Sequence, residues 1–256
     1  MKAIKIYNNH SNVENKLPLS KMNLALCKDD RHLYYGELPY SYKLEYLEST
    51  GTQYINLNYY ARGTDIVEVR VKSTTNNWNW YAGTGSNVTN YLLWNPFFGM
   101  QDSGNYKFWG TYVGNKDGSA VTTYFYNQSA GTNSYPGFTP TISKTQVLNW
   151  YTYKFNQKTL YRDGSKMTGT NGGTVDDTIL NKHTIYLFAS NEPAVQHKGT
   201  SKLQIAWFKI SDKNQNPILD MIPVRVGNIG YMYDKLSGQL YGNSGSGNFV
   251  CGPDIE

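Results

Sequence analysis

Hydrophobic and polar residues alternate most regularly between positions 64 and 72. Val67, Val69 and Val71 occupy every second position there, and charged residues fill the positions between them. Because successive side chains of a strand point to opposite faces, this period of two is typical of a strand with one buried face and one face in water. We therefore expect a strand that covers a hydrophobic core.

A second alternating segment covers residues 150–156. Every second residue from Tyr151 to Phe155 is aromatic, and the residues between them are polar. After a short polar link, residues 159–162 lead into Asp163-Gly164. Asp-Gly favours a tight hairpin turn because both positions of that turn need positive φ angles. We expect strands here, ended by such a turn.

Two further segments, 184–189 and 203–210, are nearly continuous hydrophobic runs bounded by polar residues. Short runs of this kind predict strands that are covered on both faces, so both segments are interpreted as inner strands. Trp207 lies within the second run and is expected in the core. The predicted core residues are Val67, Val69, Val71, Ile185, Leu187, Leu203 and Ile205.

The composition favours strands and turns over helices. Aromatic residues make up 15% of the 256 residues and glycine is frequent, with 24 residues, whereas long runs of strong helix formers are missing. Because all-β sandwiches often reach about 200–250 residues as one unit, we expect one main domain with an appendage. The predicted fold class is an all-β, two-sheet antiparallel sandwich with less than about a tenth of the chain in helix.

Residues 1–42 differ from the rest and predict a small N-terminal hairpin or arm. Leu24 and Leu26 precede a polar tip, and Leu33 and Tyr35 follow it. A lone hairpin is only marginally stable in water, so this one is expected to gain order by packing on a partner or on the sandwich. The predicted domains are the arm, residues 1–42, and the sandwich, residues 43–256.

Four segments resemble a family of virion proteins. Residues 43–57, which begin Lys43-Leu-Glu-Tyr-Leu-Glu-Ser-Thr-Gly, resemble the opening of laminin-G-like, concanavalin-type jelly rolls of gut-phage and prophage structural proteins. Residues 221–249 resemble the end of these proteins, and residues 150–164 and 185–210 resemble their central and late strands. The resemblance implies a concanavalin A-like jelly roll over about residues 43–252. It also implies a structural virion protein on the particle surface, as a head decoration, a head fibre or a tail-associated protein.

The N-terminal segment carries a second resemblance. Residues 24–36 look like the short hairpins at the front of phage fibre and capsid-decoration proteins. This likeness implies that the arm attaches the protein to the virion and that its partners are other virion proteins, with the capsid protein among the candidates. A homo-oligomer, such as a trimer, and synthesis in the host cytoplasm fit the same role. The attachment residues predicted are Leu24, Leu26, Leu33 and Tyr35.

Carbohydrate binding is the alternative function. Tryptophan and tyrosine offer flat apolar faces to sugar rings, and nearby polar groups can hydrogen-bond to the hydroxyls. An adhesin for host or mucosal glycans would use such residues in exposed loops, whereas the core of an aromatic-rich sandwich, or a subunit contact, uses the same residue types. The sequence leaves these two interpretations open. The candidate ligand-binding residues are Trp78, Trp80, Tyr81, Tyr91, Trp94, Trp109 and Tyr112.

Catalysis is not expected. The Glu-x-Asp-x-x-Glu pattern of related β-glucanases is absent, and Glu45, Glu48 and Glu68 have the spacing and neighbours of solvated charges. No histidine lies near a serine or cysteine in a nucleophile motif. The protein is therefore interpreted as non-enzymatic, and a glycoside hydrolase is the least favoured reading.

No cofactor or metal site is predicted. Cys27 and Cys251 lie at opposite ends without a zinc or redox spacing, and free thiols are the simpler interpretation. Sandwiches of this kind often bind calcium, but no loop shows dense acidic spacing, which favours surface-loop roles for the available aspartates. These are Asp102, Asp117, Asp176 and Asp177.

The charge and hydropathy exclude two classes of partner. The net charge is +5, but the 24 basic residues are scattered among 19 acidic ones, so no nucleic-acid partner is predicted. The first residues lack the apolar stretch of a signal peptide, and nowhere do about 18 apolar residues follow one another, so no membrane insertion is expected.

Overall fold

The structure, a computed structural model, forms two compact units, Met1–Pro39 and Tyr40–Glu256. The described residues are 22–26, 33–75, 96–102, 107–114, 120–127, 137–143, 145–157, 159–169, 175, 177, 179, 183–191 and 199–255. The second unit begins three residues earlier than the predicted boundary. The backbone explains this, because Ser41 N–H donates to the Arg225 carbonyl and Tyr42 pairs in register with Arg225.

The N-terminal unit contains the predicted hairpin. Strand β1 (Met22–Leu26) pairs antiparallel with β2 (Leu33–Glu37), with Leu24 opposite Tyr35 and Leu26 opposite Leu33. The hairpin itself is confirmed. Its role in attachment stays a prediction.

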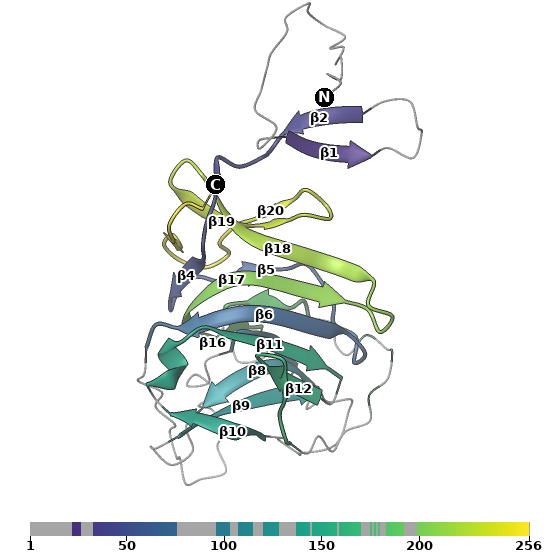
Figure 1. The fold of residues 1–256 in the computed structure, drawn as a ribbon, viewed down its shortest axis with the longest axis vertical. Coiled ribbons are helices and arrows are strands. Elements are labelled where there is room, and N and C mark those ends of the chain that lie inside the picture. Colours follow the sequence, from purple (N-terminus) through teal and green to yellow (C-terminus); the bar gives the residue numbers. More distant parts are fainter. Residues whose placement is uncertain are drawn as a thin grey trace, which may run out of the picture. The chain divides into compact units, whose positions relative to one another are not determined.

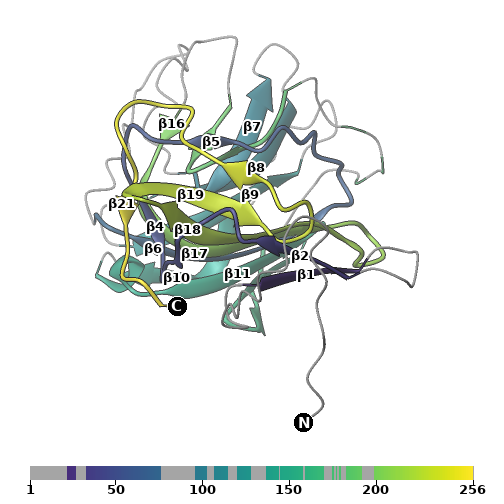
Figure 2. The same ribbon diagram turned by 90° about the horizontal axis from the view of Figure 1, so that it is seen from above.

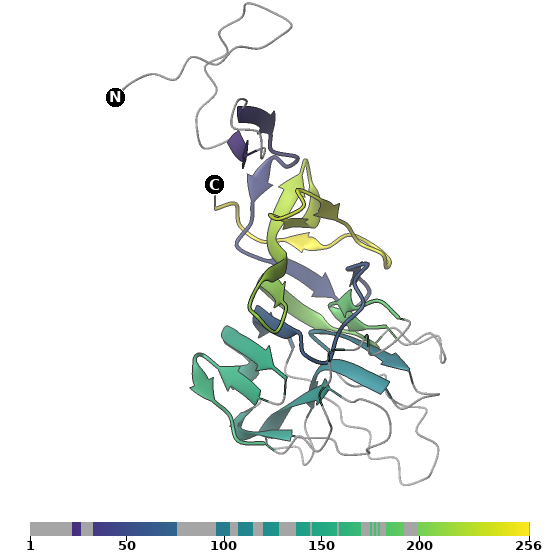
Figure 3. The same ribbon diagram turned by 90° about the vertical axis from the view of Figure 1, so that its right-hand side faces the viewer.

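The second unit is dominated by an 11-stranded sheet, called here the large sheet. Eight of its strands follow the order β13-β12-β11-β6-β17-β18-β19-β20 (Figure 1), while β3 pairs with β18 and β4 pairs with β17 and β21. Figure 3 shows β18 to β20, in yellow-green, at one end of this order and β11 to β12, in teal, towards the other, and Figure 2 is viewed from the β19 end. The strands are β3 (Tyr42–Lys43), β4 (Leu47–Thr50), β6 (Ile66–Ser73), β11 (Tyr151–Asn156), β12 (Thr159–Arg162), β13 (Ser165–Lys166), β17 (Lys202–Ser211), β18 (Pro217–Val226), β19 (Ile229–Asp234), β20 (Leu240–Tyr241) and β21 (Val250–Cys251).

A 6-stranded sheet, the small sheet, packs against it in the order β10-β9-β8-β7-β14-β5. Its strands are β5 (Ile55–Asn56), β7 (Phe98–Asp102), β8 (Lys107–Gly114), β9 (Ala120–Asn127), β10 (Gly137–Ser143) and β14 (Tyr186–Leu187). Two further short strands, β15 (Ala189–Ser190) and β16 (Gly199–Thr200), pair with each other and follow β14 in the chain. The helical content of the described residues is one 3₁₀ turn, η3 (Gln146–Leu148).

Aromatic rings join the two sheets into one core. Phe98 of the small sheet meets Phe155 and Phe208 of the large sheet at ring-centroid distances of 5.5 Å each, and Phe125 meets Phe155 at 4.8 Å. Edge-on and tilted contacts of this kind stabilise beyond the burial of ring area. Every pairing between the named strands is antiparallel, and the fold is a two-sheet antiparallel jelly-roll sandwich with a small N-terminal hairpin, as predicted.

Apart from Trp207, all of the predicted core residues are buried. Val69 is fully buried on β6 and pairs in register with Tyr153 and Phe208 on the neighbouring strands. The predicted turn is also present, because Asp163 and Gly164 have φ values of 49° and 79° between β12 and β13. The full set of predicted core positions at no more than 2% exposure is Val67, Val69, Val71, Ile185, Leu187, Leu203 and Ile205.

The interpretation of the two continuous runs needs correction. Ile205 pairs with Val71 and Trp207 pairs with Arg70, so Ala206 is the extra residue of a β-bulge. The bulge lets Phe208 face the core and leaves Trp207 half-buried on the opposite side of the sheet, with Lys209 exposed. β17 is therefore covered on both faces only at Leu203, Gln204 and Ile205, its later part has one covered face, and the expectation of Trp207 in the core is wrong.

The earlier run is covered but broken. Phe188, with a φ of 65°, separates β14 from β15, so the segment gives two short strands in place of one. Residues Leu187 to Ala189 are nonetheless fully buried. The run is thus hydrophobic because it is buried. It is divided into two strands because the left-handed backbone at Phe188 ends β14 before β15 begins.

Candidate ligand-binding face

The structure describes two of the seven predicted ligand-binding aromatic residues in part or in full. Trp109 is fully buried, and its ring contacts Phe98 at 5.3 Å and Phe125 at 6.2 Å. It belongs to the core, so its assignment to a ligand surface is wrong. Tyr112 lies on β8, but its side chain is outside the described part of the chain. The other five predicted residues, which also lie outside the described residues, are Trp78, Trp80, Tyr81, Tyr91 and Trp94.

A different surface gathers aromatic and charged side chains, namely the side of the large sheet turned away from the core. We call it the outer face. Because β6 buries Val67, Val69 and Val71, the alternate residues of β6 point outward, and so do the alternate residues of β11, β17 and β18. The outer-face residues used below are Glu68, Arg70, Lys72, Trp150, Lys154, Trp207, Lys209 and Asp220.

Charges of alternating sign cross this face from strand to strand. Glu68 is in register with Lys154 on one side and with Lys209 on the other, and Lys209 is in register with Asp220. The Lys154 Nζ to Glu68 Oε1 distance is 3.1 Å, and Asp220 lies 3.7 Å from Lys209 Nζ and 2.7 Å from Lys235 Nζ. We call Glu68, Lys154, Lys209 and Asp220 the charge row; Lys235 pairs with Asp220 but does not line the pocket that the row borders. Since its members are partly exposed, each pair stabilises the fold only weakly.

The charge row lines a shallow pocket of about 250 Å³ on the outer face. Its walls combine the charged side chains with polar and apolar residues of the turn between β17 and β18. Such a mixture suits a ligand with many hydroxyl groups, because ammonium groups donate hydrogen bonds and carboxylates accept them. The lining residues are Ile66, Glu68, Lys154, Lys209, Ser211, Gln215, Pro217, Leu219 and Asp220.

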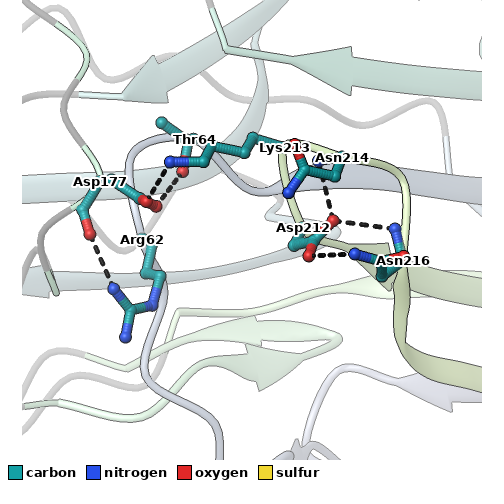
Figure 4. A network of polar contacts seen from close by, with 7 residues as sticks. All are labelled: Arg62, Thr64, Asp177, Asp212, Lys213, Asn214 and Asn216. Carbon is teal, nitrogen blue, oxygen red and sulfur yellow. Dashed lines mark hydrogen bonds and ion pairs between the residues drawn. The ribbon is translucent and has the colours of Figure 1, made fainter.

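The turn that forms one wall of the pocket is held by its own side chains (Figure 4). Asp212 Oδ1 accepts hydrogen bonds from the backbone N–H groups of Asn214 and Asn216, each at 2.8 Å, and Asn216 Nδ2 donates to Asp212 Oδ2. The hydrogen bonds from Asn216 and from the backbone lower the pKa of Asp212. These contacts fix the turn around Gln215, whose φ is 67°.

A second set of contacts ties this turn to the loop before β6 (Figure 4). Asp177 accepts hydrogen bonds from Lys213 Nζ and Thr64 Oγ1, each at 2.6 Å, and its carbonyl accepts one from Arg62. Hydrogen bonds from Lys213 and Thr64 lower the pKa of the Asp177 carboxyl. Asp177 was among the aspartates considered for calcium, and its carboxylate is engaged with an ammonium group instead.

Next to the pocket, aromatic rings and cations form a cluster around Trp150. The Arg70 guanidinium lies 5.6 Å and the Lys72 ammonium 6.0 Å from the centre of the Trp150 ring, and the Tyr46 ring lies 6.0 Å away. Trp207 is the register partner of Arg70. We call Tyr46, Arg70, Lys72, Trp150 and Trp207 the aromatic–cation cluster.

The cluster is continuous with the charge row through Lys209, whose Nζ lies 5.7 Å from the centre of the Trp207 ring. All three rings of the cluster are half-buried, so part of each ring remains accessible. Partly exposed rings beside hydrogen-bonding groups can stack on the apolar face of a sugar ring while its hydroxyls are bound. The arrangement can therefore hold a polyhydroxylated ligand.

Sequence reasoning missed this face. Trp150 was recognised only as the start of a strand, and Trp207 was placed in the core. A signal was available in the alternating pattern, because the residues between the buried ones point outward. Arg70, Lys72 and Trp150 are such residues and lie on one side of two paired strands. Tyr46 and Trp207 join them through β4 and β17, whose positions the sequence pattern does not specify.

The described residues show no assembled metal centre or membrane helix. Among them, no group of three or more histidine, cysteine, aspartate and glutamate side chains could hold a metal ion. Within the same residues no helix has the length and hydrophobicity needed to cross a membrane.

Two of the glutamates considered for catalysis, and one cysteine, have defined surroundings. Glu48 Oε2 accepts a hydrogen bond from Gln204 Nε2, and Glu68 pairs with Lys154. Cys251 is a free thiol, and burial raises its pKa.

Comparison with known proteins gives distant structural likenesses only. No protein-family model and no curated protein sequence matches the chain. A crystal structure described as a "putative carbohydrate binding protein" from Bacteroides ovatus has 10% sequence identity and a TM-score of 0.49, with 84% of this chain and 61% of that chain covered. The heptameric SAP-like pentraxin of Limulus polyphemus has 12% identity and a TM-score of 0.44, with 83% and 90% covered. The chain thus spans less than two thirds of the Bacteroides ovatus protein.

Proposed function

We propose that the protein is a non-catalytic carbohydrate-binding protein whose outer face holds a saccharide across the aromatic–cation cluster and the pocket. The observation that carries the proposal is the set of half-buried rings, Tyr46, Trp150 and Trp207, on one face of the large sheet. These rings offer stacking surfaces, and the charge row next to them offers hydrogen-bond donors and acceptors.

The position of the cluster favours binding by a preformed surface. Trp150 directly precedes β11, while Arg70 and Trp207 lie on β6 and β17, which are neighbours in the large sheet. Side chains on packed strands keep their spacing better than side chains on loops, so less ordering is needed when a ligand binds. The hydrogen-bonded turn around Asp212 holds the pocket wall in the same way.

A saccharide array followed by titration calorimetry tests the proposal. The intact protein should bind at least one saccharide without cleaving it, and Trp150→Ala or Trp207→Ala should weaken that binding at least tenfold, about 1.4 kcal/mol. Tyr60→Ala serves as the control, because Tyr60 is 45% exposed but lies in the loop before β6 and outside the cluster. Binding that survives both tryptophan variants, or release of cleaved saccharide, would contradict the proposal.

The virion role predicted for residues 1–42 is a separate proposal that rests on the resemblance of the sequence. What bears on it is that Met1–Pro39 forms a compact unit of its own with a two-stranded hairpin. Deletion of residues 1–39 should leave cooperative melting of the sandwich and abolish incorporation into particles, as followed by fractionation and mass spectrometry. Normal incorporation of the truncated protein would show that attachment does not use the arm.

A further inference from the structure

We infer that the saccharide held by the outer face is acidic and that its carboxylate or sulfate group is bound by Arg70 and Lys72. This inference deepens the proposed function and rests on it. It specifies the class of ligand, which the aromatic rings alone leave open because they stack on neutral and acidic sugars alike.

The first support is the difference between the two groups of cations on this face. Lys154 pairs with Glu68, and Lys209 and Lys235 both lie within ion-pair distance of Asp220. Arg70 and Lys72, by contrast, have no carboxylate within 4.0 Å among the residues that the structure describes. The positive charge of the aromatic–cation cluster is therefore not neutralised by its described neighbours.

The second support is the way Trp150 holds these cations. Both lie within about 6 Å of the centre of one indole ring, which is the range of a cation–π contact. The contact restrains the long side chains but occupies none of their N–H donors. A guanidinium offers a fork of donors that matches a carboxylate or sulfate, and an ammonium group adds three more. The ring thus positions two cations for an anion next to a stacking surface.

The surroundings favour a saccharide over a nucleic acid. Glu68 lies two residues before Arg70 on the same face of β6, and Glu48 is hydrogen-bonded to Gln204, the register partner of Lys72. Carboxylates therefore border the pair of cations on two sides. A nucleic acid carries a phosphate on every nucleotide, so some of its phosphates would lie close to these carboxylates and be repelled. A saccharide with more widely spaced acidic groups would avoid this repulsion.

Matched saccharides separate the contributions of charge and of stacking. Oligogalacturonate and heparin-derived oligosaccharides would be compared with carboxyl-reduced oligogalacturonate, which keeps the sugar rings and loses the charge. Titration calorimetry at two salt concentrations should show binding of at least one acidic saccharide, at least tenfold tighter than of the neutral one and weaker at high salt. Binding of oligogalacturonate shows that a carboxylate is recognised. Because heparin carries carboxylates as well as sulfates, binding of carboxyl-reduced heparin oligosaccharides shows that a sulfate is recognised.

Two charge variants test the residues. Arg70→Gln and Lys72→Gln should each weaken binding of the acidic saccharide at least fivefold, and weaken binding of the neutral saccharide by a smaller factor. Lys235→Gln, which removes a cation that is already paired with Asp220, should change acidic binding less than twofold. Melting temperatures of all variants confirm that they fold.

The outcomes distinguish the inference from the function on which it rests. Equal binding of neutral and acidic saccharides, with loss in Trp150→Ala, would overturn the inference and leave the proposed function standing. Absence of binding to every saccharide would overturn both. Tighter binding of an oligothymidylate than of any acidic saccharide would identify this surface as a nucleic-acid site and would also overturn both.

Discussion

The two faces of the large sheet come from the same strands but have opposite character. On β6, the inner residues Val67, Val69 and Val71 are buried to at least 98%, whereas the residues between them carry charge. The inner face is specified by packing, where any hydrophobic side chain of suitable shape serves. The outer face is specified by particular pairs, such as Arg70 with Trp150, that add little to packing. Features that stability does not require are the better guide to function.

The largest effect is expected when a charge is placed on the inner face. Val69→Asp would bury a carboxylate between Tyr153 and Phe208 without a partner, which should lower the free energy of unfolding by about 3–5 kcal/mol. Chemical denaturation measures this change. Arg70→Asp, which places the same residue one position along on the outer face, should change it by less than about 1 kcal/mol. Similar values for both variants would contradict the assignment of the faces.

Two adjacent aromatic residues sharpen the comparison. Phe208 is fully buried and contacts Phe98, so Phe208→Ala should destabilise by roughly 3–5 kcal/mol. Trp207 is larger but half-buried on the outer face, so Trp207→Ala should cost only about 1–2 kcal/mol. Urea denaturation of the two variants gives both values. A larger loss for Trp207 would mean that it packs in the core after all.

The bulge at Ala206 offers a test by deletion. Removing Ala206 restores plain alternation, with Ile205 inward, Trp207 outward and Phe208 inward, so the protein should fold with a loss of about 1 kcal/mol or less. Removing Gln204, in the same strand, turns either Leu203 or Ile205 outward and should be far more damaging. Thermal melting compares the two deletions. If both unfold the protein, the bulge is not a separable feature of β17.

The smallest effect is expected in the pH dependence of stability, through the ion pair of Asp177. Because the pKa of Asp177 is lowered by Lys213 and Thr64, the carboxylate contributes stability that is present above its unfolded pKa of about 3.9 and is lost as the pH falls through the lower folded value. Asp177→Asn should therefore lower the melting temperature by at most a few degrees at pH 6, and this difference from wild type should shrink as the pH falls below the unfolded pKa. Melting between pH 2 and 6 shows this, with the exposed Glu45→Gln as control. An identical difference at every pH would contradict the role of the ion pair.

The residues of the inner face could be predicted from the sequence more completely than those of the outer face. Val67, Val69 and Val71 could be assigned from alternation alone, because burial of every second residue is what forms such a strand. Trp207 was misplaced because one extra residue, Ala206, reverses the phase, and a bulge leaves no signal in a hydrophobic run. The turn at Asp163-Gly164 was predictable because aspartate and glycine adopt that backbone more readily than most other residues.

The candidate site was not predictable because it depends on strand order. Tyr46, Arg70, Trp150 and Trp207 come from four separate parts of the chain, and they share a surface only because β6 lies between β11 and β17. The basic residues are scattered among acidic ones along the sequence, so no charged site could be recognised from it. The aromatic-rich segment that drew attention instead gave one core residue, Trp109, within the described part of the chain.

Fluorine NMR of protein labelled with 5-fluorotryptophan tests the central claim most directly. The six tryptophans can be assigned by substituting each with phenylalanine, and saccharide is then titrated in. We expect the resonances of Trp150 and Trp207 to shift with saccharide concentration, while that of the fully buried Trp109 stays unchanged. If Trp150 and Trp207 do not respond and Trp78, Trp80 or Trp94 do, the saccharide binds through that segment, and the outer face is not the binding site.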